Sequence, residues 1–398
     1  MTIQIAQPQR EAGIDEALTT QLAPAPLALA VRFAPRPTNR GVVVALIPAH
    51  DEEDDIGQAL AHLHRQETPP DLVVVCADNC TDRTAERAAA GGAFVFETVG
   101  NVHKKAGALN QALDQVLPEL HDDDAILVID ADSFLAPTFV SEAQRHLHDR
   151  VGGVGGVFTG RPGGGYVGML QRNEYARYAR DVHRRKGKVL VLTGTATLFS
   201  VRTLRHVALA RAEGLIPGGG RHMTGGGGRR GPAVYDTKVH TEDNELTLAL
   251  LHLGYKVISP KGARLTTEVM DSWGDLYRQR LRWKRGAIEN LRQYGLTRVT
   301  VTYWLRQVVT FMGVLVTTAY LASFTWSLFL DRSVRLHPIW LGVTCLFVVE
   351  RMVTVRSRGL LQMVVAAVLI VEMAFDIFLQ GVHIKAVWDS LTNRERRW

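Results

Sequence analysis

Short hydrophobic runs alternate with amphipathic stretches over the first part of the chain. In the stretch after the first run, Ile56, Ala59, Leu60 and Leu63 share one helical face. Runs rich in β-branched residues, separated by stretches with helical spacing, predict strands that alternate with helices. This order predicts an α/β fold with a Rossmann-like, mostly parallel sheet. The runs are GVVVALIP at 41–48, LVVVCA at 72–77, AFVFE at 93–97 and AILVID at 125–130.

The last hundred residues follow a different pattern, with long apolar blocks. The block at 308–330 carries no charge and is long enough to cross a bilayer core of about 30 Å. The block at 360–382 is similar but contains Glu372 and Asp376, while the block at 338–349 is short for a span. We therefore expect two C-terminal transmembrane helices. The third block would lie at the interface, or would span as well and make three.

These patterns divide the chain into five expected parts. Residues 1–40 are rich in Ala and Pro and lack the apolar stretch of a secretory signal, so we expect a disordered lead-in and a large domain on the cytoplasmic side of the membrane. The glycine-rich stretches at 151–168 and 213–232 are expected to be flexible loops rather than lids. The other expected parts are an α/β domain at 41–275, a basic amphipathic interface helix at 276–303, a multi-pass membrane region at 304–384 and a basic cytoplasmic tail at 385–398.

Charge and cysteine content limit the classes of ligand and partner that the chain is expected to bind. The net charge is +6, and much of the basic excess lies at 278–298, directly before the first apolar block. Basic residues beside a membrane segment favour anionic lipids, and no nucleic-acid-binding module is present, so we expect no nucleic acid. The three cysteines are too few for a disulfide framework or a zinc site.

Acidic residues follow three of the predicted strands. Asp51 and Glu52 follow the first, Asp78 follows the second, and Asp130 and Asp132 lie at the end of the fourth. Ligands of such sheets bind beyond the carboxyl ends of the strands, so these acids should share one edge. Two carboxylates one residue apart suit a hard divalent cation that also contacts substrate phosphates. An isolated D-x-D is equally compatible with a solvated turn.

Further motifs remove that ambiguity, because they occur together and in a fixed order. With them the chain resembles the inverting family-2 glycosyltransferases, especially the processive membrane synthases of cellulose, hyaluronan, chitin and poly-N-acetylglucosamine. The most specific of the motifs are T-E-D and Q-x-x-R-W before the apolar blocks. The stretches that carry the resemblance are IPAHDEE (47–53), ADNCTDRTAE (77–86), KAGALNQAL (105–113), DADS (130–133), TGTATLF (193–199), TEDNELTLAL (241–250) and QRLRW (279–283).

This resemblance implies a GT-A fold, a UDP-sugar donor and a role for each matching residue. Asp243, the last residue of T-E-D, would be the catalytic base. Asp130 and Asp132 would also hold the metal, Mg²⁺ or Mn²⁺, with Asp132 the better ligand. The acceptor would be bordered by Glu242, Gln279 and Trp283. The donor-binding residues would be Glu52, Asp78, Lys105, Asp130, Asp132 and Arg282.

Other interpretations of single residues stay open. Trp283 has the position of an interfacial aromatic anchor beside basic residues. Glu242 and Asp243 are also acids at a helix N-terminus, where the helix dipole favours them. Both interpretations are compatible with a place in the site.

The expected function is extension of a β-linked glycan from a UDP-sugar, with UDP-N-acetylglucosamine as the first donor to consider. The acceptor would be a glycan or a lipid-linked glycan. No transmembrane helix is expected before the catalytic domain, so export would need a partner subunit or a homodimer. Alternatives are single-sugar transfer to a lipid or short glycan, a catalytically silent scaffold that binds nucleotide sugar, and a transporter with a cytoplasmic domain.

Overall fold

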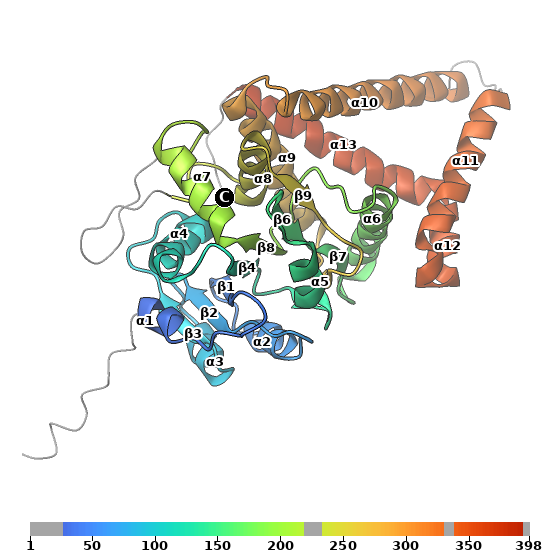
Figure 1. Ribbon diagram of the computed structural model, residues 1–398. Coiled ribbons are helices and arrows are strands. Elements are labelled where there is room, and N and C mark those ends of the chain that lie inside the picture. The colour runs from blue at the N-terminus through green and yellow to red at the C-terminus, as the bar shows by residue number, and fades with distance from the viewer. Residues whose placement is uncertain (1–26, 219–232, 330–337, 393–398) are drawn as a thin grey trace, which may run out of the picture.

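A seven-stranded sheet forms the centre of the computed structural model shown in Figure 1. The structure describes residues 27–218, 233–329 and 338–392. Strand order in the sheet is β3-β2-β1-β4-β8-β6-β9. The strands are β1 (Val43–Ala49), β2 (Leu72–Ala77), β3 (Phe94–Glu97), β4 (Ala125–Ile129), β6 (Val151–Gly155), β8 (Ala196–Ser200) and β9 (Lys256–Ile258).

The four strands that the sequence predicts lie side by side and parallel, with β1 between β2 and β4. Strand β8 then runs antiparallel to both β4 and β6. The carboxyl ends of β1, β2 and β4 therefore meet at one edge, where their acidic residues follow. The mostly parallel α/β fold is confirmed.

Helices cover both faces of this sheet, so its central strands are buried on both sides. On one face pack α2 (Ile56–His64), α3 (Thr84–Ala90) and α5 (Phe139–His146). On the other pack α1 (Leu27–Arg32), α4 (Lys104–Val116), α7 (Val201–Ala212) and α8 (Glu242–His252). The short 3-10 turn η1 (Leu117–Glu119) follows α4.

Part of the segment expected to be a disordered lead-in is folded. Leu27 and Val31 of α1 are buried in the core beside α4. Three arginines then fasten the chain up to the first strand, and residues 1–26 lie outside the described part of the chain. The ion pairs are Arg32 with Glu119 at 2.8 Å, Arg36 with Asp124 at 3.1 Å and Arg40 with Asp71 at 2.6 Å.

The glycine-rich stretch at 151–168 is not a flexible loop, and that expectation was wrong. It forms β6, then β7 (Val157–Gly160), then the start of α6 (Gly165–Arg184). A Cβ on Gly153 would lie 2.7 Å from Leu192, and one on Gly156 would lie 2.1 Å from Leu265. The glycines are there because neighbouring side chains occupy the space. Of the other glycine-rich stretch, 213–232, residues 219–232 lie outside the described residues.

A second, three-stranded sheet adjoins the first. Its order is β5-β10-β7, with β5 at Phe134–Leu135 and β10 at Arg264–Thr267. Strands β10 and β5 are antiparallel, with Thr266 opposite Phe134. The same register places Glu268 opposite Asp132, just beyond both strands.

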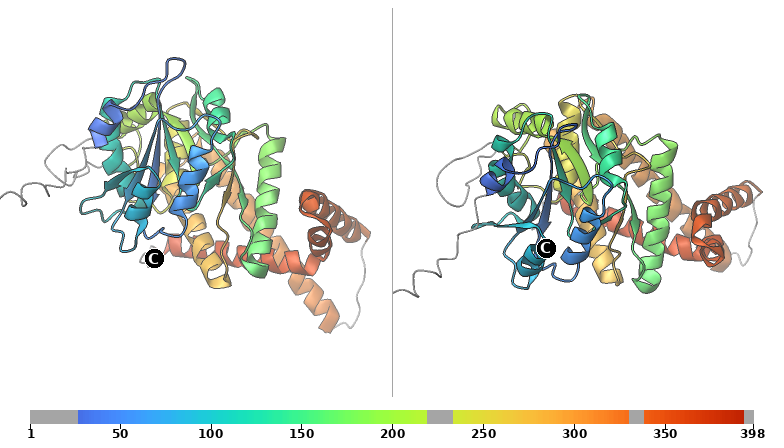
Figure 2. Two further views of the ribbon diagram at one scale, coloured as in Figure 1. Left: turned by 90° about the horizontal axis from the view of Figure 1, so that it is seen from below. Right: turned by 60° about the horizontal axis from the view of Figure 1, so that its bottom comes forward.

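The C-terminal third is helical. Its elements are α9 (Trp273–Tyr294), α10 (Thr300–Phe329), α11 (Pro338–Val355), the short turn η2 (Arg356–Arg358), α12 (Leu360–Ala367) and α13 (Leu369–Leu391). Helix α13 packs along α9, while α10, α11 and α12 extend away from the sheet (Figures 1 and 2). Residues 330–337 and 393–398 lie outside the described residues. The first half of the predicted basic tail, 385–391, is the end of α13 and not a separate segment.

The predicted membrane spans at 308–330 and 360–382 are not supported. Within the residues that the structure describes, no helix combines the length and the apolar character needed to cross a membrane. The 360–382 block is divided between α12 and α13, which meet at Val368. Asp376 pairs with Arg351 of α11 at 2.8 Å, and the side chain of Glu372 lies outside the described part.

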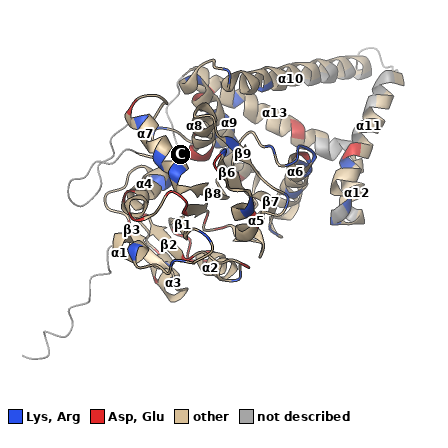
Figure 3. Cartoon of the chain, viewed as in Figure 1, with Lys and Arg blue, Asp and Glu red and all other residues tan. Residues whose placement is uncertain are grey.

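Helix α10 nevertheless has an unusual surface. Leu305, Val309, Trp326 and Phe329 are each at least 60% exposed. Figure 3 shows almost no charge along this helix. Its single charged residue is Arg306. An apolar surface of this length is far beyond the scattered exposed residues of an ordinary globular surface.

Candidate active site

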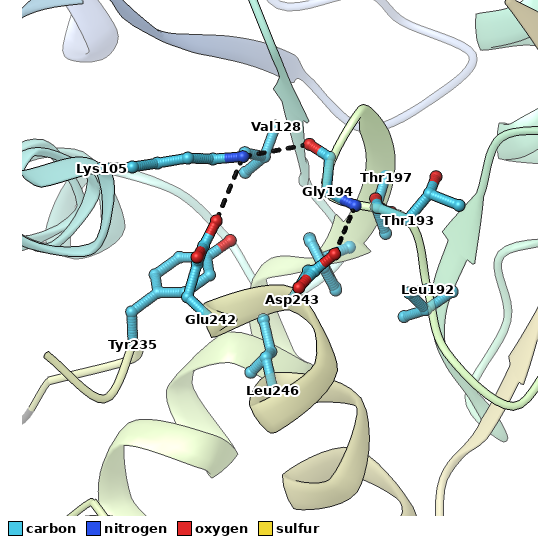
Figure 4. A pocket seen from close by; sticks show the side chains of 11 residues that line it. Lys105, Val128, Leu192, Thr193, Gly194, Thr197, Tyr235, Glu242, Asp243 and Leu246 are labelled. Atoms are coloured by element: carbon cyan, nitrogen blue, oxygen red, sulfur yellow. Dashed lines mark hydrogen bonds and ion pairs between the residues drawn. The ribbon is translucent and has the colours of Figure 1, made fainter. Parts of the chain in front are cut away.

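A lysine and three carboxylates meet where β4, α4 and α8 converge. Lys105 lies in the first turn of α4, and its Nζ is 2.5 Å from Oδ1 of Asp130 at the end of β4. The same Nζ is 3.3 Å from Oε1 of Glu242 and donates to the carbonyl oxygen of Gly194 at 3.2 Å. Figure 4 shows Lys105, Glu242 and Asp243 around this small cavity. Four residues named from sequence are thus brought together.

The neighbouring carboxylates keep Lys105 protonated. Burial lowers the pKa of Lys105, but the carboxylates of Asp130, Glu242 and Asp243 outweigh burial and raise it above its usual value. The site therefore holds a permanent positive charge beside the D-x-D motif. Such a charge can stabilise a leaving group that departs as a diphosphate.

Asp243 has the environment of a general base. Its Oδ2 accepts from the backbone N–H of Gly194 at 2.9 Å, and its Oδ1 accepts from the N–H of Asn244 at 2.7 Å. Burial and the adjacent Glu242 raise the pKa of Asp243 to about 6, although Lys105 and both hydrogen bonds lower it. A base with this pKa is ionised at neutral pH and still takes up a proton readily.

A buried ion pair fixes the helix that carries this base. Arg211 of α7 and Glu245 of α8 are almost fully buried, and Nη1 of Arg211 lies 3.0 Å from Oε1 of Glu245. Tyr294 of α9 donates to the same carboxylate at 2.6 Å. Breaking such a pair leaves an unpaired charge in the core, which costs about 3–5 kcal/mol. We conclude that α8 is anchored two residues after Asp243.

The first residues of α8 also pack tightly against α9. The side chain of Asn290 donates to the carbonyl oxygen of Thr241 at 3.2 Å and to Oδ1 of Asn244 at 2.9 Å. A Cβ on Gly286 would lie 2.5 Å from Oγ1 of Thr241. The T-E-D segment is therefore packed against α9, and its acids line the cavity.

The loop between α6 and β8 links this site to α10. Tyr303 of α10 donates its hydroxyl proton to the carbonyl oxygen of Leu190. The N–H of Leu192 donates to Oγ1 of Thr247 on α8 at 3.0 Å. Two residues later the loop reaches Gly194. Its carbonyl oxygen accepts from Lys105 and its N–H donates to Asp243, as described above.

A second acidic group lies beside the first. Burial and the charge of Asp132 raise the pKa of Glu52 to about 7, while burial and Asp130 raise the pKa of Asp132 to about 7. Glu268, which the strand register places opposite Asp132, contributes to both shifts. No signal in the sequence pointed to Glu268, because its position depends on an antiparallel pairing between distant segments.

Arg161 partly balances this acidic group. Its guanidinium pairs with Asp55 through two bonds of 2.7 and 2.8 Å and lies over the ring of Phe134, 4.6 Å from its centroid. Arg161 lowers the pKa of Asp132, but that pKa remains raised. Neither Asp55 nor Arg161 was predicted from the sequence.

These carboxylates fit a divalent cation. Their oxygens are the hard ligands that Mg²⁺ and Mn²⁺ prefer, and the pKa values of Glu52 and Asp132 are raised first by burial and then by neighbouring negative charge. Among the described residues, the three-ligand group with closely spaced atoms is Asp51, Cys80 and Asp82. That group is a poorer fit, because Asp51 already accepts from the backbone and hydroxyl of Thr81. Mg²⁺ sites built from one or two carboxylates plus phosphates do not need three protein ligands.

Asp78 lies apart from the lysine cluster, at the end of β2. It is 7% exposed, and its Oδ1 accepts three hydrogen bonds. The donors are Thr98 at 2.7 Å, Asn101 at 2.8 Å and Asn79 at 3.1 Å. Its carboxylate is thus held by neutral donors, in contrast to Asp130.

The Q-x-x-R-W motif lies on α9, and its two arginines differ. Arg282 is exposed and makes no ion pair with any described residue. Arg280, which was not predicted, is 3% exposed and pairs with Glu174 at 2.7 Å. Its guanidinium also lies 4.3 Å from the centroid of the Trp283 ring and donates to Oε1 of Gln279 at 2.8 Å. Arg280 therefore orients the two residues predicted to border the acceptor.

A family model described as "Glycosyltransferase like family 2" matches residues 40–286, which hold every site residue predicted from the sequence. The chain belongs to glycosyltransferase family 2. The family-2 domain thus extends through the central sheet and most of α9.

Two curated relatives of this family-2 glycosyltransferase carry the same name. The poly-beta-1,6-N-acetyl-D-glucosamine synthase of Staphylococcus aureus (strain MSSA476) is 25% identical over 294 residues, which are 70% of this chain and 64% of that protein. The synthase of the same name from Staphylococcus epidermidis is 23% identical over 305 residues, covering 71% and 66%. The chain thus spans less than two thirds of the length of the S. aureus relative.

Solved structures support the GT-A-like fold of this family-2 glycosyltransferase. The mannosyltransferase PcManGT from Pyrobaculum calidifontis, solved with GDP-Man and Mn²⁺, superposes with a TM-score of 0.51 at 18% identity. The match covers 91% of this chain and 90% of that one. At this level of identity the likeness concerns the fold alone.

Proposed function

We propose that this glycosyltransferase is an inverting enzyme that transfers N-acetylglucosamine from its UDP-linked form to a growing β-linked glycan. The observation that carries the proposal is the contact set around Gly194. The backbone of one residue, Gly194, donates to a carboxylate with a pKa of about 6 and accepts from the charged lysine that pairs with the D-x-D motif. An inverting sugar transfer needs a base for the acceptor and positive charge for the leaving group.

Asp243 takes the proton from the acceptor hydroxyl while that oxygen attacks the anomeric carbon of the donor sugar. A new C–O bond forms as the bond between the anomeric carbon and the diphosphate breaks, so the configuration inverts. Lys105 offsets the negative charge that develops on the departing UDP. Since Lys105 already bonds to Asp130 and Glu242, it is oriented before the donor arrives.

Asp130 and Asp132 would hold a Mg²⁺ or Mn²⁺ ion, which supplies further positive charge to the diphosphate when bound. Glu52 and Glu268 add negative charge around this position. Gln279 and Trp283, oriented by Arg280, would border the acceptor, and the exposed Arg282 would meet the donor or acceptor. A flat indole ring is a suitable surface for a sugar.

The named relatives support a polymer as product, because both are called poly-N-acetylglucosamine synthases. Single-sugar transfer to a lipid or short glycan is the second candidate. The incomplete coverage of the relatives keeps it open, because segments that guide a polymer could lie outside the matched part.

We also propose that the enzyme works attached to the cytoplasmic face of the plasma membrane through its C-terminal helices. The support is the exposed apolar surface of α10, whose transfer from water is worth about 25 cal/mol per Å². A second copy or another subunit could cover the same surface, and either could complete a route for export.

The test is release of UDP from a panel of UDP-sugars by the purified full chain, with Mn²⁺, Mg²⁺ or chelator, followed by sizing of the glycan. Metal-dependent turnover of UDP-N-acetylglucosamine with long products is expected. Short products would favour single transfer. Absence of turnover with every donor, in detergent and in native membranes alike, would contradict the proposal and favour a silent binding scaffold.

A further inference from the structure

The side-chain amide of Asn101 is fully hydrogen-bonded beside Asp78 of the predicted donor site. It is 8% exposed and lies in the turn between β3 and α4. Its Nδ2 donates to Oδ1 of Asp78 at 2.8 Å and to the carbonyl oxygen of Lys104 at 2.8 Å, while its Oδ1 accepts from the N–H of His103 at 2.9 Å. Reversing this amide would set oxygen against two other oxygens, so its orientation is fixed.

The two oxygens of Asp78 consequently differ. Oδ1 accepts from Asn101, Thr98 and Asn79. Among the described residues none donates to Oδ2, and that atom is not among the buried unsatisfied atoms, so it retains contact with solvent. A side chain that is more than nine-tenths buried thus presents one bare acceptor atom to solvent.

A carboxylate oxygen can only accept a hydrogen bond, so it selects a ligand atom that donates. Uracil carries a ring N–H at N3, whereas cytosine has a bare, accepting N3 in the same place. A site built to accept from this N–H rejects a base without it, because two acceptors would face each other without water.

We propose that Asn101 is a positioning residue that fixes the direction of the Asp78 carboxylate and thereby sets the preference of the donor site for uracil over cytosine. The proposal rests on the proposed function, a transfer from a UDP-sugar, and takes Asp78, a donor-binding residue by resemblance, as the residue that contacts the base. Asn101 donates to Asp78, so it acts through that carboxylate.

Asn101 is also tied to the catalytic lysine. Its bond to Lys104 holds the first residue of α4, which has a φ of 50°, in the left-handed region that lysine seldom adopts. The next residue is Lys105. One amide therefore connects the position of the base-binding carboxylate with the start of the helix that supplies the diphosphate charge.

Gly107 provides an independent test of this arrangement. A Cβ at position 107 would lie 2.0 Å from Oδ1 of Asn101. Gly107→Ala should therefore displace the Asn101 amide without touching Asp78. Gly57 is the matched control, because it is also helical and a Cβ there meets nothing within 4 Å.

The experiment measures the affinities of UDP and CDP by calorimetry on the purified full chain at constant Mn²⁺, with a thermal melt of each variant. The wild type should prefer UDP by about 100-fold. Asp78→Asn should prefer CDP, because its amide oxygen takes the three donors and its NH₂ then faces the ligand. Gly107→Ala and Asn101→Ala should each reduce the UDP preference about tenfold, while Gly57→Ala leaves it unchanged.

An unchanged UDP preference in folded Gly107→Ala and Asn101→Ala would overturn the role of Asn101 alone. A wild type that binds no UDP, or binds CDP equally well, would overturn the proposed donor and this inference with it.

Discussion

Two aspartates at opposite ends of the candidate site, Asp78 and Asp243, show how neighbouring residues suit the same side chain to different tasks. Asp78 is surrounded by neutral donors, all on one oxygen, and its other oxygen is left bare. Asp243 accepts two backbone N–H groups, one on each oxygen, and lies in a network of charges that includes Lys105 and Glu242.

The difference separates recognition from reaction. A carboxylate fixed by neutral donors has a constant direction and suits selection of a ligand N–H. A carboxylate whose pKa is adjusted by burial and nearby charges suits proton transfer. Changes at the Asp243 end should therefore alter turnover, whereas changes at the Asp78 end should alter nucleotide affinity.

The largest effect is expected from Asp243→Asn. The amide keeps the shape of the side chain but cannot accept the acceptor proton, so kcat should fall by about 10³-fold while UDP affinity stays within about twofold of the wild type. Steady-state kinetics and UDP calorimetry measure the two quantities. A variant that retains turnover would show that another group is the base.

Replacing Lys105 by Met should lower kcat by about 10²-fold, because the departing diphosphate loses a fixed positive charge. The same change should weaken UDP binding, since Lys105 lies between the two ends. Lys104→Met is the matched control, because the Lys104 side chain is exposed one residue earlier. Equal losses in both variants would indicate damage to α4 rather than loss of charge.

Activity should depend on the ionisation of Asp243. With its pKa raised to about 6, kcat/KM should fall about tenfold for each pH unit below 6 and level off above 7, because the base works only when deprotonated. Glu242→Gln removes a charge that raises this pKa, so the acidic limb should move to lower pH. Movement to higher pH, or no movement, would contradict the assignment.

A smaller effect is expected from Gly194→Ala. The added Cβ would lie 3.1 Å from Oδ2 of Asp243 and 3.4 Å from Nζ of Lys105, so it should disturb both and lower kcat about tenfold. Nucleotide selectivity between UDP and CDP should be unchanged, because Gly194 does not contact Asp78. A loss of selectivity here would break the separation between the two ends.

The sequence was a good guide to the parts of the site that follow strand ends. The hydrophobic runs predicted the parallel sheet, and the sheet placed Asp78, Asp130 and Asp132 along one edge. Residues whose position depends on tertiary pairing could not be found in this way. Glu268 needs the β5–β10 register, and Arg280 needs α9 to turn that residue, rather than Arg282, inward.

Two other differences have local causes. Glycine at 151–168 was interpreted as a sign of flexibility, but the glycines of β6 and the residue after it make room for Leu192 and Leu265. The role of Asn101 could not be predicted, because its partners in the folded chain include a turn with left-handed backbone at Lys104. Apolar length at 308–382 predicted spans, yet hydropathy gives no information on where the helices break.

The loop before β8 couples α10 to the reaction centre mechanically. Tyr303 of α10 donates to Leu190 at one end of this loop, and four residues later the backbone of Gly194 contacts both Asp243 and Lys105. The surroundings of α10 should therefore influence catalysis. Exchanging detergent, bilayer or a partner subunit around α10 should change kcat far more than the affinity for UDP.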